Sequence, residues 1–279
     1  RRGRRRAPRR ADGRGQELHV YEGDVEQLAS ATSAGIGVRV IHDNRQGFAY
    51  AGSLDPDVLA ETLAEARDNA TFATDDEWLG LAEPDGLAVP ALDLYRESLT
   101  RVSTDAKIDL ALELERAVRA ADPRITGVES ADYADGVSEG AVVSTTGIRT
   151  YGRETSCYVA AHCVATDGDD TQTGFGFSVG RTLDDLDVSV AAGDAARRAT
   201  RLLGATKPAS GRVTVVLDPY VTAQFLGIIG STLSGEAVLK GRSLFADRLG
   251  ESVAAAGFTL VDDATNPLAY SSSETDGEG

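Results

Sequence analysis

The sequence lacks, or nearly lacks, several residue types whose absence is informative. It contains no methionine, even at position 1, so we expect the true start of the chain to be missing. Its only two cysteines, Cys157 and Cys163, are too few for a disulfide framework, which favours a reducing, cytoplasmic location. Apolar residues never form the run of about 18 to 20 that spans a bilayer, so no membrane partner is expected.

Negative charge dominates the chain. The formal net charge is −16 at pH 7, although eight arginines and only one aspartate give residues 1–14 a charge of +7, so that the rest of the chain carries −23. Such an acidic surface repels phosphate backbones, and general nucleic-acid binding is therefore not expected. A hydrophobic content of 42% is that of a folded protein with a sizeable core.

Residues 1–15 stand apart as an arginine-rich tail. A nucleic-acid arm, a transit peptide or a twin-arginine signal would each explain the arginines, but no apolar run follows to make a signal-peptide core. A tail of mostly Arg, Gly, Ala and Pro also results when a GC-rich gene is read out of frame. We therefore interpret residues 1–15 as a disordered or out-of-frame tail.

The remaining pattern predicts an α+β fold, with antiparallel strand meanders and packed helices in the N-terminal region. The first α/β segment, residues 16–82, combines short strands with a helix that opens at Asp55 and Pro56. Residues 83–106 are interpreted as a connector, because prolines and glycines interrupt any periodicity there. A central α/β segment, residues 107–207, follows, and its first helix starts near Ser103 or Thr104.

Residues 208–279 are predicted to begin a β-rich C-terminal domain that is truncated. Arg212–Leu217 is expected to be a buried strand. Asp218 and Pro219 then open a fourth helix. Its apolar side chains, Val221, Phe225, Ile228, Ile229 and Leu233, are expected to face inward. Residues 271–279 are polar and turn-like, and no helix or strand that would complete the domain is predicted there.

Glycine and aspartate patterns offer only weak signs of a binding site. Gly35-Ile36-Gly37 lies in a strand context and lacks the third glycine of a phosphate-binding loop. We therefore favour a structural role, in which the glycines relieve steric crowding of the backbone within a sheet. Asp167, Asp169 and Asp170 lack the bidentate glutamate of a calcium loop, so a hairpin turn is favoured.

Cysteine, histidine and serine patterns are equally weak. In a strand, Cys157 and Cys163 share one face while His162 points to the other, so packing is favoured over a metal cluster. His19 and His42 lie far in sequence from any candidate nucleophile. The candidate serines, Ser144, Ser156 and Ser234, lack the Gly-x-Ser-x-Gly context of a hydrolase.

Several segments together resemble the TldD/PmbA family, and within it the PmbA branch, also called TldE. The matching segments of the first half are 25–28, 35–41, 45–50, 54–56 and 66–70, and those of the second half are 215–219, 233–238, 240–243, 262–263 and 276–279. The resemblance covers most of Gly15 to Gly279. It implies an α/β N-terminal region and a β-rich C-terminal domain that begins near Arg212. Family members usually open with a helix, which the arginine-rich tail does not resemble.

The resemblance also implies a role for Gly235, Glu236 and Lys240. In the TldD branch this helix carries His-Glu-x-x-x-His, in which two imidazoles hold zinc and the glutamate takes a proton from bound water. Here Glu236 occupies the glutamate position, whereas Gly235 and Lys240 occupy the two ligand positions and cannot bind the metal. No catalytic or metal-binding residue is therefore expected in this chain.

The resemblance leads to one principal hypothesis and two alternatives. The chain is interpreted as the non-catalytic subunit of a heterodimeric zinc peptidase that cleaves unfolded or peptide substrates, with zinc held by a TldD-like partner. One alternative is an autonomous hydrolase with another active site, for which zinc bound by Cys157, His162 or Cys163 would be evidence. The other is a regulatory binding module without a peptidase role, as older descriptions of the family as a gyrase modulator imply.

Overall fold

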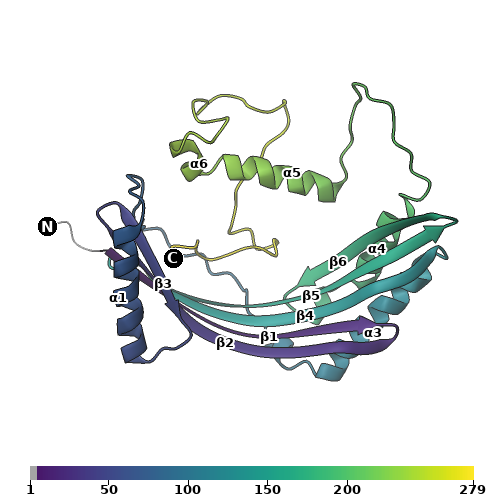
Figure 1. Ribbon diagram of the computed structural model, residues 1–279, viewed down its shortest axis with the longest axis horizontal. Helices are drawn as coiled ribbons and strands as arrows, with labels where there is room; N and C mark the ends of the chain where they lie inside the picture. The colour runs from purple at the N-terminus through teal and green to yellow at the C-terminus, as the bar shows by residue number, and fades with distance from the viewer. Residues whose placement is uncertain (1–4) are drawn as a thin grey trace. The chain divides into compact units, whose positions relative to one another are not determined.

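A computed structural model describes residues 5–279, with side chains described from residue 13 onward. It divides into two compact units (Figure 1). The sheet unit comprises residues 1–205 together with 264–279, and the second unit comprises residues 206–263. Among the helices described, none combines the length and the apolar character needed to cross a membrane.

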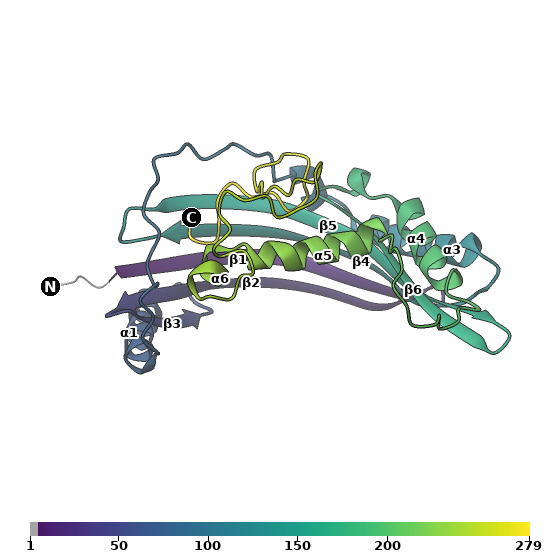
Figure 2. The same ribbon diagram turned by 90° about the horizontal axis from the view of Figure 1, so that it is seen from above.

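The sheet unit is built on one curved antiparallel sheet of six strands in the order β3-β2-β1-β4-β5-β6 (Figures 1 and 2). The strands are β1 (Arg5–Tyr21), β2 (Asp24–His42), β3 (Arg45–Ala51), β4 (Ile125–Val143), β5 (Arg149–Asp167) and β6 (Asp170–Gly180). Each half is a three-stranded meander, and the pairing of β1 with β4 joins the halves into one sheet. The predicted α+β class with antiparallel meanders is confirmed.

Two-residue turns close the hairpins of the first meander. Glu22 and Gly23 have φ of 52° and 82°, and Asp43 and Asn44 have φ of 49° and 59°. Positive φ at both central residues is the turn geometry that matches the twist of antiparallel strands. The carboxylate of Glu115, which is buried, accepts a hydrogen bond from the Gly23 N–H at 2.8 Å and so fixes the first hairpin to a helix.

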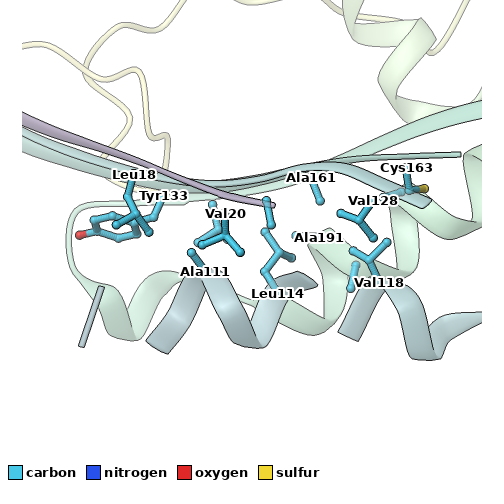
Figure 3. Packing of buried hydrophobic residues seen from close by; sticks show 14 of the residues in the cluster. Leu18, Val20, Ala111, Leu114, Val118, Val128, Tyr133, Ala161, Cys163 and Ala191 are labelled. Carbon is cyan, nitrogen blue, oxygen red and sulfur yellow. The ribbon is translucent and has the colours of Figure 1, made fainter. Parts of the chain in front are cut away.

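Three long helices pack on the sheet: α1 (Pro56–Phe72), α3 (Thr104–Ala121) and α4 (Val188–Thr200). Leu18 and Val20 of β1 lie in the core on the side of the sheet that faces α3, and Cys163 of β5 lies near Val118 and Val128 (Figure 3). Val38 of β2 packs against α1 and is paired with position 8 of β1. Position 8 is an even number of residues from Leu18, so Val38 and Leu18 lie on the same face of the sheet. All three helices therefore cover the same face, and the opposite face is here called the open face.

The helix starts follow the predicted capping residues. Asp55 accepts a hydrogen bond from the Asp57 N–H, and Ser103 accepts one from the Ala106 N–H. Asp218 does the same for the Val221 N–H at the start of α5 (Pro219–Thr232). Side-chain caps of this kind satisfy N–H groups that the helix leaves unpaired. The shorter helices are α2 (Glu97–Thr100), η1 (Leu183–Asp185) and α6 (Gly235–Leu239).

Glycine lets α4 approach β6 unusually closely. A Cβ atom on Gly174 would lie 2.2 Å from the Ala195 carbonyl oxygen, and one on Gly176 would lie 2.0 Å from the Ala191 carbonyl oxygen. Gly47 of β3 plays the same part for α1, where an added Cβ would lie 1.9 Å from the Ala66 carbonyl oxygen. Helix and strand can be this close only because neither contact surface carries a larger side chain.

The structure differs from the sequence analysis at the N-terminus. A disordered or out-of-frame tail is predicted for residues 1–15, but residues 5–15 belong to β1 and pair with β2 on one side, and from residue 9 with β4 on the other. Backbone pairing between long neighbouring strands needs no particular side chain, which is why composition alone misleads here. Residues 1–4 lie outside the described part of the chain.

The second unit also departs from the expectation. Arg212–Leu217 is not a strand, and Val216 is 91% exposed. A strand needs a hydrogen-bonded neighbour, and no described residue pairs with this segment. Helix α5 forms as predicted, but Phe225, Ile228, Ile229 and Leu233 are exposed rather than buried. The spacing of the apolar residues therefore predicted the helix correctly, but the burial predicted for its apolar side chains was wrong.

Residues 264–279 return to the sheet unit without forming a helix or strand. The Tyr270 carbonyl accepts a hydrogen bond from the Arg181 guanidinium at 2.7 Å. The Glu274 carboxylate accepts from the Leu92 N–H at 2.8 Å, and Glu278 is ion-paired with Arg39 of β2. This C-terminal segment is therefore tied to both β2 and the connector.

Candidate functional site

The three positions at which the family resemblance implies zinc chemistry lie on α6. Helix α5 ends before Leu233, and Ser234 caps a separate short helix by accepting a hydrogen bond from the Ala237 N–H at 3.2 Å. Gly235 is the first residue of α6, and Lys240 is its C-terminal cap. The two helices are separate because the backbone of Ser234 is extended, with φ of −64° and ψ of 146°.

Glu236 and Lys240 form an ion pair on this short helix. The Lys240 Nζ lies 3.1 Å from Glu236 Oε1, and the Glu236 carboxylate is largely exposed. With glutamate N-terminal to lysine this arrangement suits the helix dipole, and at an exposed site it contributes about 0.3–0.5 kcal/mol.

These residues do not fit a zinc-binding pair. Gly235 offers no side-chain donor, and the Lys240 ammonium carries a positive charge that opposes a Zn²⁺ ion. Lack of room for a side chain is not the reason for a glycine at position 235, because a Cβ there would meet no atom within 4 Å. In the described part of the chain, no group of three His, Cys, Asp or Glu side chains is arranged to hold a metal ion.

The two cysteines and His162 lie on opposite faces of β5, as the strand periodicity predicts. Cys157 and Cys163 are each 1% exposed on the helix-covered face, whereas His162 is exposed on the open face. Burial raises the pKa of Cys157 to about 12, and its thiol donates to the Thr182 carbonyl at 3.2 Å. A protonated, buried thiol is neither a good nucleophile nor a good metal ligand.

The glycine and aspartate patterns have structural roles. Gly35 and Gly37 lie within β2, and a Cβ on Gly37 would lie 3.1 Å from the ring of Phe48. The Asp167–Asp170 cluster is the β5–β6 hairpin turn, with Gly168 at φ +59°. The backbone N–H of Gly204, 2.6 Å from the Asp170 carboxylate, is the main reason why the pKa of Asp170 is lowered.

Spacing arguments missed a polar chain on the open face. His19 on β1 is paired with Glu26 at 3.0 Å and with Asp132 on β4 at 2.6 Å. The Ser130 hydroxyl donates to Asp132 at 2.8 Å and lies 3.4 Å from Nδ1 of His162. His19 and Asp132 are 113 residues apart, so only the β1–β4 pairing brings them together.

The polar chain is not a serine-hydrolase triad. In a triad the serine hydroxyl donates to an imidazole, which a carboxylate holds from its other side. Ser130 instead donates directly to Asp132, and the carboxylate partner of His19 is the same Asp132. Two of the other candidate serines have structural roles, since Ser234 caps α6 and Ser144 bonds within its own turn to Thr146.

Several cavities open on the sheet unit, and three of them lie on the open face. The largest, about 600 Å³, lies between strands β4 and β5 and the C-terminal segment, with Arg181 and Tyr270 in its wall. Two smaller cavities of about 340 and 260 Å³ lie over β2, β1, β4 and β5 and share Glu17 and Tyr158. The open face is therefore hollowed along β4 and β5 and again across β2, β1, β4 and β5.

Comparison with known proteins places these features in a family. The models of the PmbA/TldA metallopeptidase match in three parts: domain 1 at residues 9–70, the central domain at 97–203 and the C-terminal domain at 210–279. The metalloprotease PmbA of Escherichia coli is 26% identical over 95% of this chain and 59% of its own length. A metalloprotease of Methanocaldococcus jannaschii is 27% identical over 96% of this chain and 60% of its own.

Solved structures show the same fold. TldE from Thermococcus kodakarensis superposes with a TM-score of 0.78 at 20% identity, and a Thermotoga maritima protein with a TM-score of 0.79 at 23% identity. Each comparison covers 99% of this chain but 62% of the other. The chain thus spans about three fifths of the length of the relatives that it matches.

Proposed function

Because the chain belongs to the PmbA/TldD metallopeptidase family, we propose that it is the non-catalytic subunit of a heterodimeric zinc peptidase. The observation that carries this proposal is the pair of residues at the ligand positions. Gly235 has no donor atom, and Lys240 places an ammonium group there that is paired with Glu236. The zinc of the complex is then held by a TldD-like partner.

The proposal explains why Glu236 does not act as a general base here. A general base in a zinc peptidase must reach a water molecule whose proton the metal has made acidic. Glu236 is instead exposed and neutralised by Lys240 at 3.1 Å. Its role in this chain is the local stability of α6.

This subunit would contribute substrate-binding surface rather than chemistry. The open face carries cavities of about 340 and 260 Å³ and a row of polar side chains, which suit an unfolded or peptide substrate. We place the complex in the cytoplasm, because both cysteines are unpaired thiols. Since the chain covers 59% of the E. coli relative, these statements concern the full-length protein.

Zinc content and peptide cleavage of the full-length protein test the proposal. The protein is measured alone and mixed with a His-Glu-x-x-x-His relative from the same genome. We expect no stoichiometric zinc in the protein alone and cleavage only in the mixture, abolished when the glutamate of the partner is changed to glutamine. Zinc together with cleavage by this protein alone would support the autonomous hydrolase instead. Stable binding to a different partner, without any effect on cleavage, would support the regulatory module.

A further inference from the structure

Two adjoining cavities on the open face, of about 340 and 260 Å³, form one trough that crosses β2, β1, β4 and β5. Glu17 and Tyr158 line both cavities. Tyr158 is paired with Ala134 across β5 and β4, and Ala134 is paired with Glu17 across β4 and β1. The carboxylate and the phenol ring therefore rise from the same cross-strand row, on either side of an alanine.

The floor of the trough consists of small residues. The row next to Glu17 and Tyr158 is formed by Gly15, Gly136, Ala31 and Ser156 on four adjacent strands. All four line the larger cavity. A side chain that enters beside Glu17 can therefore reach the sheet backbone, whereas larger residues at these positions would fill the space.

The electrostatic character of the trough is negative. Glu17 is exposed, and no described residue forms an ion pair or hydrogen bond with its carboxylate. The other carboxylates that line the trough are paired: Asp132 and Glu26 with His19, and Asp135 with Lys107. The pKa of the Tyr158 phenol is raised, first by burial and then by the charges of Asp132 and Glu17. A cation would therefore find, beside an electron-rich ring, a carboxylate that no described residue pairs.

We propose that the trough binds a lysine or arginine side chain of an extended polypeptide, held between the Glu17 carboxylate and the ring of Tyr158. The inference rests on the proposed function and adds the substrate class: unfolded segments that carry positive charge. Tyr158 is 40% exposed, so its ring face is accessible for a cation–π contact. The acidic chain, with a net charge of −16, favours approach of such segments and disfavours acidic ones.

Binding of a defined peptide to the full-length protein tests the inference. The probe is a fluorescein-labelled peptide of twelve residues, with three lysines separated by glycine and serine, and its control carries norleucine in place of lysine. We expect the norleucine peptide to bind at least about tenfold more weakly. The changes Glu17→Gln and Tyr158→Leu should each weaken lysine-peptide binding about fivefold, and the effect of Glu17→Gln should shrink at high salt.

The matched control is Glu65→Gln, which removes an exposed carboxylate on α1, a helix on the other face of the sheet. It should leave the affinity unchanged. Equal binding by wild type and Glu17→Gln, or equal binding of the two peptides, would overturn the inference. Cleavage by the mixture despite either result would leave the subunit role standing. Trough binding without any cleavage by the mixture would instead contradict the subunit role alone.

Discussion

Replacing Lys107 with methionine is expected to destabilise the sheet unit by about 3–5 kcal/mol, because it would leave a buried carboxylate unpaired. Lys107 on α3 is ion-paired with Asp135 on β4, and their side chains are 8% and 11% exposed. The ammonium also donates to Gln16 on β1 at 2.5 Å. The Tyr133 hydroxyl, at 2.8 Å, would be the remaining donor to the carboxylate, which favours the lower end of the range.

The matching double variant separates pairing from packing. Changing Lys107 to methionine and Asp135 to leucine together removes both charges while keeping apolar volume, so we expect it to recover at least half of the loss. Urea unfolding followed by far-UV circular dichroism gives the free energies of wild type, of Lys107→Met, of Asp135→Leu and of the double variant. Lys207→Met, at an exposed position of the second unit, is the control and should change the free energy of unfolding by less than about 0.5 kcal/mol. Strictly additive single effects would refute the argument that the pair acts as one unit.

Three further perturbations test other parts of the structure. Glu236→Gln should leave cleavage by the mixed complex within about twofold of wild type, since its carboxylate only pairs with Lys240; a loss of orders of magnitude would contradict the non-catalytic assignment. The Cys157 pKa is raised from 9.0 to about 12, so its contribution to stability should be complete below pH 9 and decline as pH rises toward 12; Cys157→Ala should flatten this alkaline slope in pH-dependent unfolding. Gly174→Ala should lower the melting temperature by several degrees, because the new Cβ would lie 2.2 Å from a helix carbonyl, whereas Gly152→Ala, with open space around it, should not.

Local signals in the sequence were sufficient to locate the helices. Asp55, Ser103 and Asp218 each cap a helix as predicted, because a cap depends only on residues within one turn of the chain. The alternation of Cys157 and His162 across β5 was equally local, since successive residues of a strand point to opposite faces.

Features that depend on distant pairing could not be predicted. The contact between His19 and Asp132 exists only because β1 pairs with β4, and nothing within either strand specifies that neighbour. The trough between Glu17 and Tyr158 has the same origin, since three strands must align before its row of side chains exists. The apolar residues of α5 show the converse: spacing defines an apolar face but does not say what covers it.

The two halves of the sheet use the same device at their outer strands. Next to the helix-facing Gly47 of β3, the Phe48 carbonyl accepts a hydrogen bond from Asn69 of α1 at 2.9 Å. Next to Gly174 of β6, the Phe175 carbonyl accepts one from Arg198 of α4 at 2.7 Å. Asn69 lies three residues after Ala66, which contacts Gly47, and Arg198 lies three residues after Ala195, which contacts Gly174.

This repeated arrangement bears on where another polypeptide can bind. An exposed edge strand recruits a new strand through its unpaired backbone groups, and side chains that occupy those groups oppose such pairing. Adding a strand beside β3 or β6 would displace the hydrogen bond from Asn69 or from Arg198. The helices already cover one face of the sheet in both halves. The C-terminal segment contacts the open face at Arg39 and over β4 and β5, so the part of this face that remains for a polypeptide is the region around Glu17.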